Sequence, residues 1–231
     1  MNLSSFATAI SSLIYPTRCP SCGKGNCTHC RKTIRGEVSI TFRGPLQIYA
    51  GSKYSPGISR IILSAKEENQ IAARLFLAEC LTESLKKAIE EISQKRNRKI
   101  NKVFLIPIPS RKIADRKRGF AHIELLLKSF IELNQEINFQ ALDCLYHSKK
   151  IIDQSSLNFS ERAMNMKGAF AVNIVRYFEI YPTRNSDSVV FLVDDLVTSG
   201  ATVQAANSAL STLGARLDGV LASCATQGFS H

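Results

Sequence analysis

VVFLVDDLVTSGATVQAA spans residues 189–206 and contains three patterns in succession. The first is an uninterrupted apolar run, which is typical of a strand covered on both faces of a parallel sheet. The second is a pair of adjacent carboxylates, Asp194 and Asp195. The third is a turn of small and hydroxyl-bearing residues that leads into apolar residues at helical spacing, from Val203 to Leu213. This order predicts a buried strand, a ligand-facing edge and a helix, the repeating unit of an α/β fold.

The residues after the apolar run suit a phosphorylated sugar. Carboxylates at the carboxyl end of a parallel strand face the ligand crevice, where they accept hydrogen bonds from ribose hydroxyls or help to hold a hydrated Mg²⁺. The turn offers backbone N–H groups, hydroxyls and a helix N-terminus to a phosphate, and Gly200 permits close approach of the backbone. An acidic strand end before an ordinary capped helix is the alternative, but the complete order favours the phosphate site. Its candidate residues are Thr198, Ser199, Gly200, Ala201 and Thr202.

An earlier strand supplies a second candidate loop. Val103–Ile106 is a short apolar run closed by Pro107, and the stiff segment Pro109-Ser110-Arg111 follows it. Backbone amides and the basic side chain of Arg111 or Lys112 suit a pyrophosphate group. The alternative is a proline-terminated strand beside a solvated run of charges.

The rest of the chain alternates between strand and helix signals, which predicts a parallel sheet flanked by helices. Turn residues at Gly44-Pro45 predict a hairpin, and a helical pattern broken near Glu68-Asn69 follows it. The expected elements are the hairpin at 38–56, helices at 58–93 and 120–134, a weak strand at 142–146, the helix at 201–213 and a last strand at 217–225.

Four cysteines form two C-x₂-C pairs near the N-terminus. Four thiolates can hold a structural Zn²⁺ tetrahedrally, and a segment with few apolar residues gains folding free energy from the metal. A redox pair and four cysteines without a ligand are the alternatives. Because only four residues separate the pairs, His29 is an alternative ligand to one thiolate. The expected zinc ligands are Cys19, Cys22, Cys27 and Cys30.

The net charge of +11 is concentrated in one stretch. Between Gln94 and Phe120 there are ten Lys or Arg residues against one carboxylate, Asp115, and the remainder of the chain is close to neutral. Such a stretch favours nonspecific contact with a polyanion, such as single-stranded DNA. The alternative is a solvated surface, part of which serves the pyrophosphate instead. The candidate DNA contacts are Lys95, Arg96, Arg98, Lys99 and Lys117, and Arg118 is assigned to the pyrophosphate.

Composition and patterning indicate a cytoplasmic protein. No apolar run approaches the roughly 20 residues that a membrane span needs. Residues 1–18 have apolar residues at helical spacing and lack the basic start and cleavage site of a signal peptide. The seven cysteines are odd in number and clustered, which fits a reducing compartment better than a disulfide framework.

The phosphate segment resembles a known motif. Val190–Thr202 is similar to the thirteen-residue phosphoribosyl-pyrophosphate motif of type I phosphoribosyltransferases. With the N-terminal helix, the cysteine pairs and the hairpin, the chain as a whole resembles the ComF family, whose members are linked to natural transformation. Ser64-Ala65-Lys66-Glu67 is a weak version of that family's LKY segment, and Ala121-His122 stand where it usually has Asn-Gln. Further matches are Arg118-Gly119-Phe120, Gln154, Leu157, Arg162, Asn165 and Ala169-Phe170.

The resemblance implies a type I phosphoribosyltransferase-like core that binds phosphoribosyl pyrophosphate with Mg²⁺. It also implies a role in handling incoming single-stranded DNA together with other DNA-uptake proteins. We expect an N-terminal helix and zinc module at 1–36 and a phosphoribosyltransferase-like domain at 37–231, with a hood-like part at 37–95 and a core at 96–231.

Three classes of function fit these expectations. In an enzyme, a nucleophile attacks C1 of the ribose and pyrophosphate leaves, with Asp194 and Asp195 as candidate catalytic residues. A binding module for phosphoribosyl pyrophosphate or DNA is the second class, and a regulator that senses the ligand is the third. Release of pyrophosphate with a panel of bases distinguishes the first class, and salt-dependent DNA binding without turnover distinguishes the second.

Overall fold

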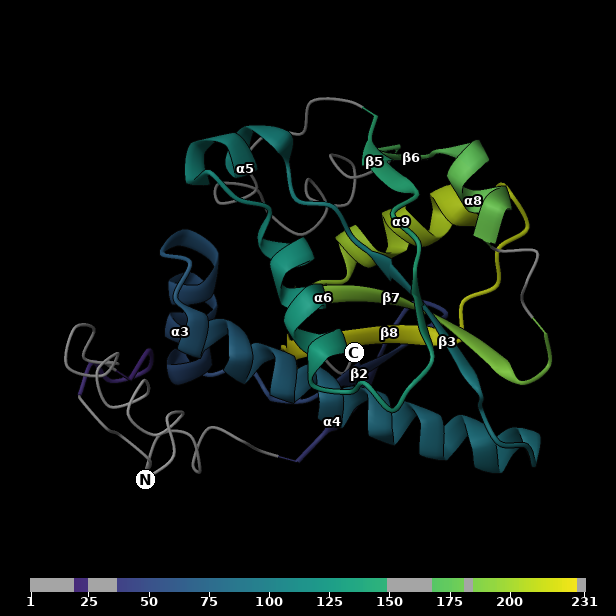
Figure 1. The fold of residues 1–231 in the computed structure, drawn as a ribbon, viewed down its shortest axis with the longest axis horizontal. Coiled ribbons are helices and arrows are strands. Elements are labelled where there is room, and N and C mark those ends of the chain that lie inside the picture. The colour runs from purple at the N-terminus through teal and green to yellow at the C-terminus, as the bar shows by residue number, and fades with distance from the viewer. Residues whose placement is uncertain (1–18, 25–36, 149–167, 181–184, 228–231) are drawn as a thin grey trace, which may run out of the picture.

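The computed structural model describes residues 19–24, 37–148, 168–180 and 185–227, which fold into a six-stranded sheet with helices on both faces (Figure 1). The strands are β1 (Ser39–Arg43), β2 (Leu46–Ala50), β3 (Lys102–Pro107), β4 (Phe139–Ala141), β5 (Leu145–His147), β6 (Phe170–Val172), β7 (Ser188–Val197) and β8 (Gly219–Ala225). The helices are α3 (Pro56–Glu67), α4 (Ile71–Arg96), α5 (Lys112–Arg118), α6 (His122–Glu132), α8 (Ile174–Ile180) and α9 (Ala201–Ser211).

The main sheet is mostly parallel. Its strand order is β1-β2-β8-β7-β3-β4, and only the edge pair β1–β2 is antiparallel. Strands β5 and β6 form a separate antiparallel pair. The central strands β7, β8 and β3 are almost wholly buried, as expected for parallel strands covered on both faces.

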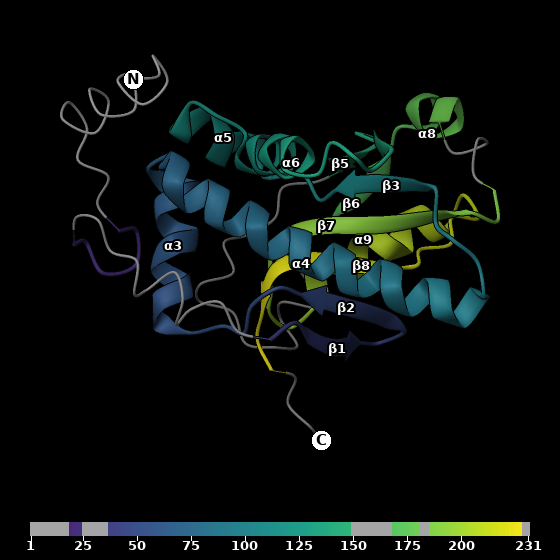
Figure 2. The same ribbon diagram turned by 60° about the horizontal axis from the view of Figure 1, so that its bottom comes forward.

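Alternation along the central strands divides the core into two layers. In β7, Val189, Phe191 and Val193 pack with α3, α4 and α6, whereas Val190 and Leu192 pack with α9 and the β5–β6 pair. Figure 2 accordingly shows α4 in front of the sheet and α9 behind it. The sheet therefore holds its strand ends between two helical layers, with the carboxyl ends of β3 and β7 at one edge.

The predicted α/β class, with a mostly parallel sheet flanked by helices, is confirmed together with most element positions, and several bounds differ. The helical pattern breaks as predicted between α3 and α4, at Asn69 with a φ of 52°. The weak strand predicted at 142–146 is displaced, because residues 142–144 separate β4 from β5. Helix α5 was not predicted, since its sequence KIADRKR has too few apolar residues to show a period.

Three sequence predictions fall wholly or partly outside the described residues. The amphipathic helix at 1–18 lies outside them, and so do Cys27 and Cys30. The family matches at Gln154, Leu157, Arg162 and Asn165 lie outside them as well. None of the helices in the described part of the chain is both long and apolar enough to cross a membrane.

Candidate functional site

The carboxyl ends of β3 and β7 bring the two predicted loops together. The strands pair in parallel, with Pro107 opposite Val193, and the Ile108 N–H donates to the Val193 carbonyl at 3.0 Å. A cavity of about 450 Å³ lies between the loops that follow. The predicted site residues that line it are Pro109, Ser110, Arg111, Arg118, Asp194, Asp195, Thr198 and Thr202.

The two carboxylates have different surroundings. Asp195 Oδ2 lies 3.3 Å from Lys66 Nζ and 3.3 Å from His122 Nε2. Asp194 Oδ1 instead accepts the backbone N–H of Asp195 at 2.9 Å. The side chains of Asp195 and His122 are 6% and 2% exposed, whereas that of Lys66 is 33% exposed. Two side chains of the helical layer, one from α3 and one from the start of α6, therefore approach Asp195, and Lys66 donates a hydrogen bond to it.

These surroundings move the two pKa values in opposite directions. Burial, followed by the charge of Asp195, raises the pKa of Asp194 well above its ordinary value. Burial alone would also raise the pKa of Asp195, but Lys66 and His122 outweigh it and lower that pKa. The charge of Asp195 in turn raises the pKa of Lys66. Asp195 is thus the ionised member of the pair. Asp194 is the carboxyl whose protonation state the charge of a ligand can most readily change.

The turn predicted to bind phosphate is supported from behind by a residue of the hairpin. Arg43, at the end of β1, donates from Nε to the Thr198 carbonyl and from Nη2 to the Thr226 carbonyl, each at 2.7 Å. Its aliphatic stem packs under Gly200, where an added Cβ would lie 2.6 Å from Arg43 Cβ and Cγ. Gly200 has a φ of 80° and caps α9 without a side-chain hydrogen bond. The turn is therefore fixed by Arg43, and in the first turn of α9 the Ala201 N–H donates to Ser199 Oγ at 3.4 Å.

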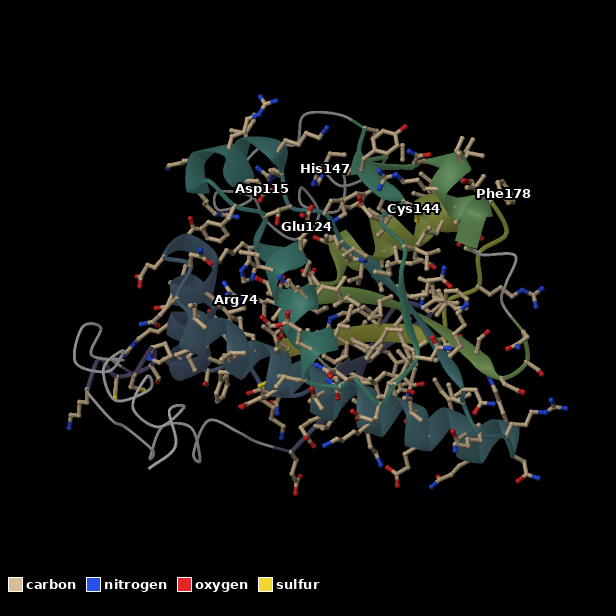
Figure 3. The ribbon with its side chains drawn as sticks, viewed as in Figure 1. Arg74, Asp115, Glu124, Cys144, His147 and Phe178 are labelled. Carbon is tan, nitrogen blue, oxygen red and sulfur yellow. The ribbon has the colours of Figure 1, made fainter. Side chains whose placement is uncertain are left out.

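A histidine at the end of β5 contacts the opposite loop and has a defined tautomer. His147 Nε2 lies 2.9 Å from the Pro109 carbonyl, which is an acceptor only, so Nε2 carries the proton. Burial lowers the pKa of His147, and its buried Nδ1 has no hydrogen-bond partner among the described residues. Figure 3 shows His147 at the same end of the molecule as Asp115 of α5. The residue as a whole lines the cavity.

Arg118 is held in place by neighbouring carboxylates. Its Nε and Nη2 lie 3.0 and 2.9 Å from the Glu67 carboxylate oxygens, and Nη1 lies 3.8 Å from Asp115 Oδ1. The first contact joins α5 to α3 across the mouth of the cavity. Arg118 thereby contributes a fixed positive charge to the cavity wall.

The basic stretch is divided between the two ends of the sheet. Arg96 pairs with Asp218 and donates to the Ser188 carbonyl beside the amino ends of β7 and β8, and Arg98 lies 3.4 Å from Asp187 Oδ1. Lys95 pairs with Glu91 one helical turn away. Lys117 lies on α5, beyond the six-residue strand β3, which spans roughly 20 Å. The predicted DNA contacts therefore form two surfaces rather than one.

Half of the predicted zinc site lies within the described residues. Cys19 and Cys22 flank a turn in which the Gly23 N–H donates to the Cys19 carbonyl at 2.8 Å, and Gly23 has a φ of 74°. Neither thiol forms a disulfide. Within the described ranges no three His, Cys, Asp or Glu side chains converge on a metal position, and the other predicted ligands lie outside those ranges.

Comparison with protein-family models gave no match, and comparison with curated proteins gave none either. Sequence analysis missed four residues that shape it: Lys66, His122, Arg43 and His147. Lys66 and His122 were noted only where the chain departs from the ComF pattern, and Arg43 and His147 carry no local signal because their partners are distant in sequence.

Proposed function

We propose that the chain binds phosphoribosyl pyrophosphate in the cavity between the β3 and β7 loops. The observation that carries the proposal is the convergence, at one sheet edge, of a carboxylate pair, an Arg43-supported phosphate turn and a proline-framed basic loop. The 5-phosphate binds the amides at 199–202, and the ribose hydroxyls donate to Asp194. The pyrophosphate then lies beside Arg111 and Lys66.

The two carboxylates in the cavity are not equally available to Mg²⁺. Asp194 offers a carboxylate to the cavity, whereas Asp195 Oδ2 is already engaged by Lys66 and His122. Magnesium usually keeps several waters and takes one or two carboxylates plus ligand phosphates. We therefore assign to Asp194 the one protein contact of a magnesium ion carried in by the pyrophosphate, where the ion neutralises phosphate charge.

A transferase activity is the second candidate, and His147 favours it. Its neutral imidazole lines the same cavity, and its buried Nδ1 has no hydrogen-bond partner among the described residues. In transfer, an acceptor nucleophile forms a bond to C1 of the ribose, the C1–O bond to pyrophosphate breaks, and His147 Nδ1 takes the acceptor's proton. Pyrophosphate release with a panel of nucleobases and amines tests this candidate, and no release with any acceptor leaves a binding module.

The resemblance to the ComF family supports two further proposals. The first is that the chain acts in DNA uptake and natural transformation, where it contacts single-stranded DNA through its basic surfaces. The second is that Cys19 and Cys22, with Cys27 and Cys30, hold a structural zinc. The turn at Gly23 leaves both described thiols unpaired and available as ligands. Elemental analysis of the purified protein should give about one zinc per chain, and iron or no metal would contradict the assignment.

A thermal-shift experiment tests the proposed ligand. A ligand that binds only the native state raises the melting temperature, so millimolar phosphoribosyl pyrophosphate with Mg²⁺ should stabilise the protein. Replacing Asp194 and Asp195 together by Ala should remove most of that rise. Asp187→Ala, at an exposed position beside the amino end of β7, is the matched control and should retain it. An equal rise in the double variant would refute the site.

A further inference from the structure

The ammonium group of Lys66 occupies the position at Asp195 that a cation would take. Lys66 Nζ lies 3.3 Å from Asp195 Oδ2, and His122 Nε2 lies at the same distance from the same oxygen. The Asp195 side chain is 6% exposed, so water contributes little to its solvation. Its charge is balanced by a lysine that α3 carries into the cavity.

Lys66 is positioned to contact a ligand as well as Asp195. It lines the cavity, and its side chain is one-third exposed, unlike the almost wholly buried His122. An ammonium group has three N–H donors, and Asp195 uses one of them. The remaining donors suit phosphate or ribose oxygens in the same space.

The charges that line the cavity favour an anionic ligand without an added metal. The cations are Lys66, Arg111 and Arg118, and the carboxylates are Asp194 and Asp195. Since a divalent ion at Asp195 would have to displace Lys66 or lie against its ammonium group, the two cations compete for one carboxylate. Because the lysine is part of the chain, no metal complex has to assemble before the ligand binds.

We propose that Lys66 takes the place of a protein-bound divalent cation at Asp195, so that the cavity binds phosphoribosyl pyrophosphate without requiring Mg²⁺. This inference rests on the proposed function. Lys66 bridges Asp195 and the ligand's pyrophosphate oxygens, and His122 lies beside the same carboxylate oxygen. Magnesium carried by the ligand is tolerated at Asp194 but adds little affinity.

Isothermal titration calorimetry with phosphoribosyl pyrophosphate tests the inference in two arms. The first arm compares the wild-type protein in EDTA and in millimolar Mg²⁺, and we expect dissociation constants that agree within about threefold. Binding that appears only with Mg²⁺ overturns the inference while the proposed function stands. Absence of binding under both conditions contradicts the proposed function itself.

The second arm replaces Lys66 by Met, which keeps the aliphatic stem and removes the charge. In EDTA the affinity should fall about 10- to 100-fold, as expected for loss of a charge-assisted hydrogen bond, and Mg²⁺ should restore part of it. Lys87→Met, at an exposed ion pair on α4, is the matched control and should bind as the wild type does. Equal affinity of the Lys66 variant and the wild type in EDTA would overturn the inference. The first arm needs no variant and decides the question even if Lys66→Met fails to fold.

Discussion

Two adjacent aspartates differ because their partners come from distant parts of the chain. Lys66 lies 129 residues before Asp195, and His122 approaches it from another helix. Asp194 accepts a neighbouring backbone N–H, and burial and the charge of Asp195 raise its pKa. The sequence predicted a pair of carboxylates at a ligand edge. It could not assign their separate states, because no local pattern encodes a contact over that distance.

The raised pKa of Asp194 implies a stability cost in the ligand-free protein. The folded state keeps a proton that the unfolded chain releases above its ordinary pKa of 3.8, so stability falls as pH rises through the folded pKa. The lowered pKa of Asp195 has the opposite sign, and its contribution is lost only as pH falls below the ordinary range. Asp194→Asn should therefore raise the free energy of unfolding near pH 8 by about 1 kcal/mol, and the melting temperature by about 2–4 °C. The same substitution should weaken ligand binding.

Thermal melts of the two proteins from about pH 5 to about pH 8 measure this difference, which should shrink toward the acidic end. Asp143→Asn, at an exposed ion pair with Arg176, is the control and should change little. A melting temperature below that of the wild type at pH 8 would show that ionised Asp194 stabilises the site.

At the scale of elements, the β1–β2 hairpin supports the phosphate turn. Gly44-Pro45 was sufficient to predict the hairpin, but its role depends on Arg43, which contacts Thr198 over a separation of 155 residues. The helical break between α3 and α4 was also predictable, because its residues interrupt an apolar period. Helix α5 was not, since its placement depends on the ion pairs of Arg118 with α3.

Removing Arg43 should loosen the turn without touching the ligand directly. Arg43→Ala removes the guanidinium donor from the Thr198 and Thr226 carbonyls and empties the space beneath Gly200. We expect the free energy of unfolding to fall by about 2–4 kcal/mol, the range for a broken buried hydrogen-bond network. Ligand binding should weaken as well. Urea denaturation followed by calorimetry measures both effects. Arg176→Ala should change stability by less than about 0.5 kcal/mol, and an equally small effect of Arg43→Ala would refute its supporting role.

At the scale of the whole molecule, the sheet separates charges that are contiguous in sequence. Strand β3 runs between the Lys95–Lys99 segment and the α5 cations, so one end of the basic stretch borders the ligand cavity and the other lies at the opposite edge (Figure 1). Arg96 is committed to Asp218 and to strand carbonyls. The sequence predicted the parallel sheet correctly from alternating elements, but the count of charges contained no information on their separation.

This separation makes the DNA proposal testable at each end. Replacing the exposed residues Arg98 and Lys99 by Gln should weaken single-stranded DNA binding and lower the salt slope by roughly 0.7 per lost contact, without affecting the cavity. Replacing Lys112 and Lys117 is the matched variant at the cavity end. Fluorescence anisotropy at several salt concentrations measures both variants, and unchanged affinity and slope in both would show that these charges are only solvated.

The position of bound phosphoribosyl pyrophosphate in a crystal structure of the complex tests the central claim most directly. The 5-phosphate should lie against the backbone amides at 199–202, with the ribose hydroxyls on Asp194 and the pyrophosphate between Lys66 and the Pro109–Arg111 loop. A ligand bound with its phosphates away from this edge, or no ligand in the cavity at saturating concentration, would contradict the account.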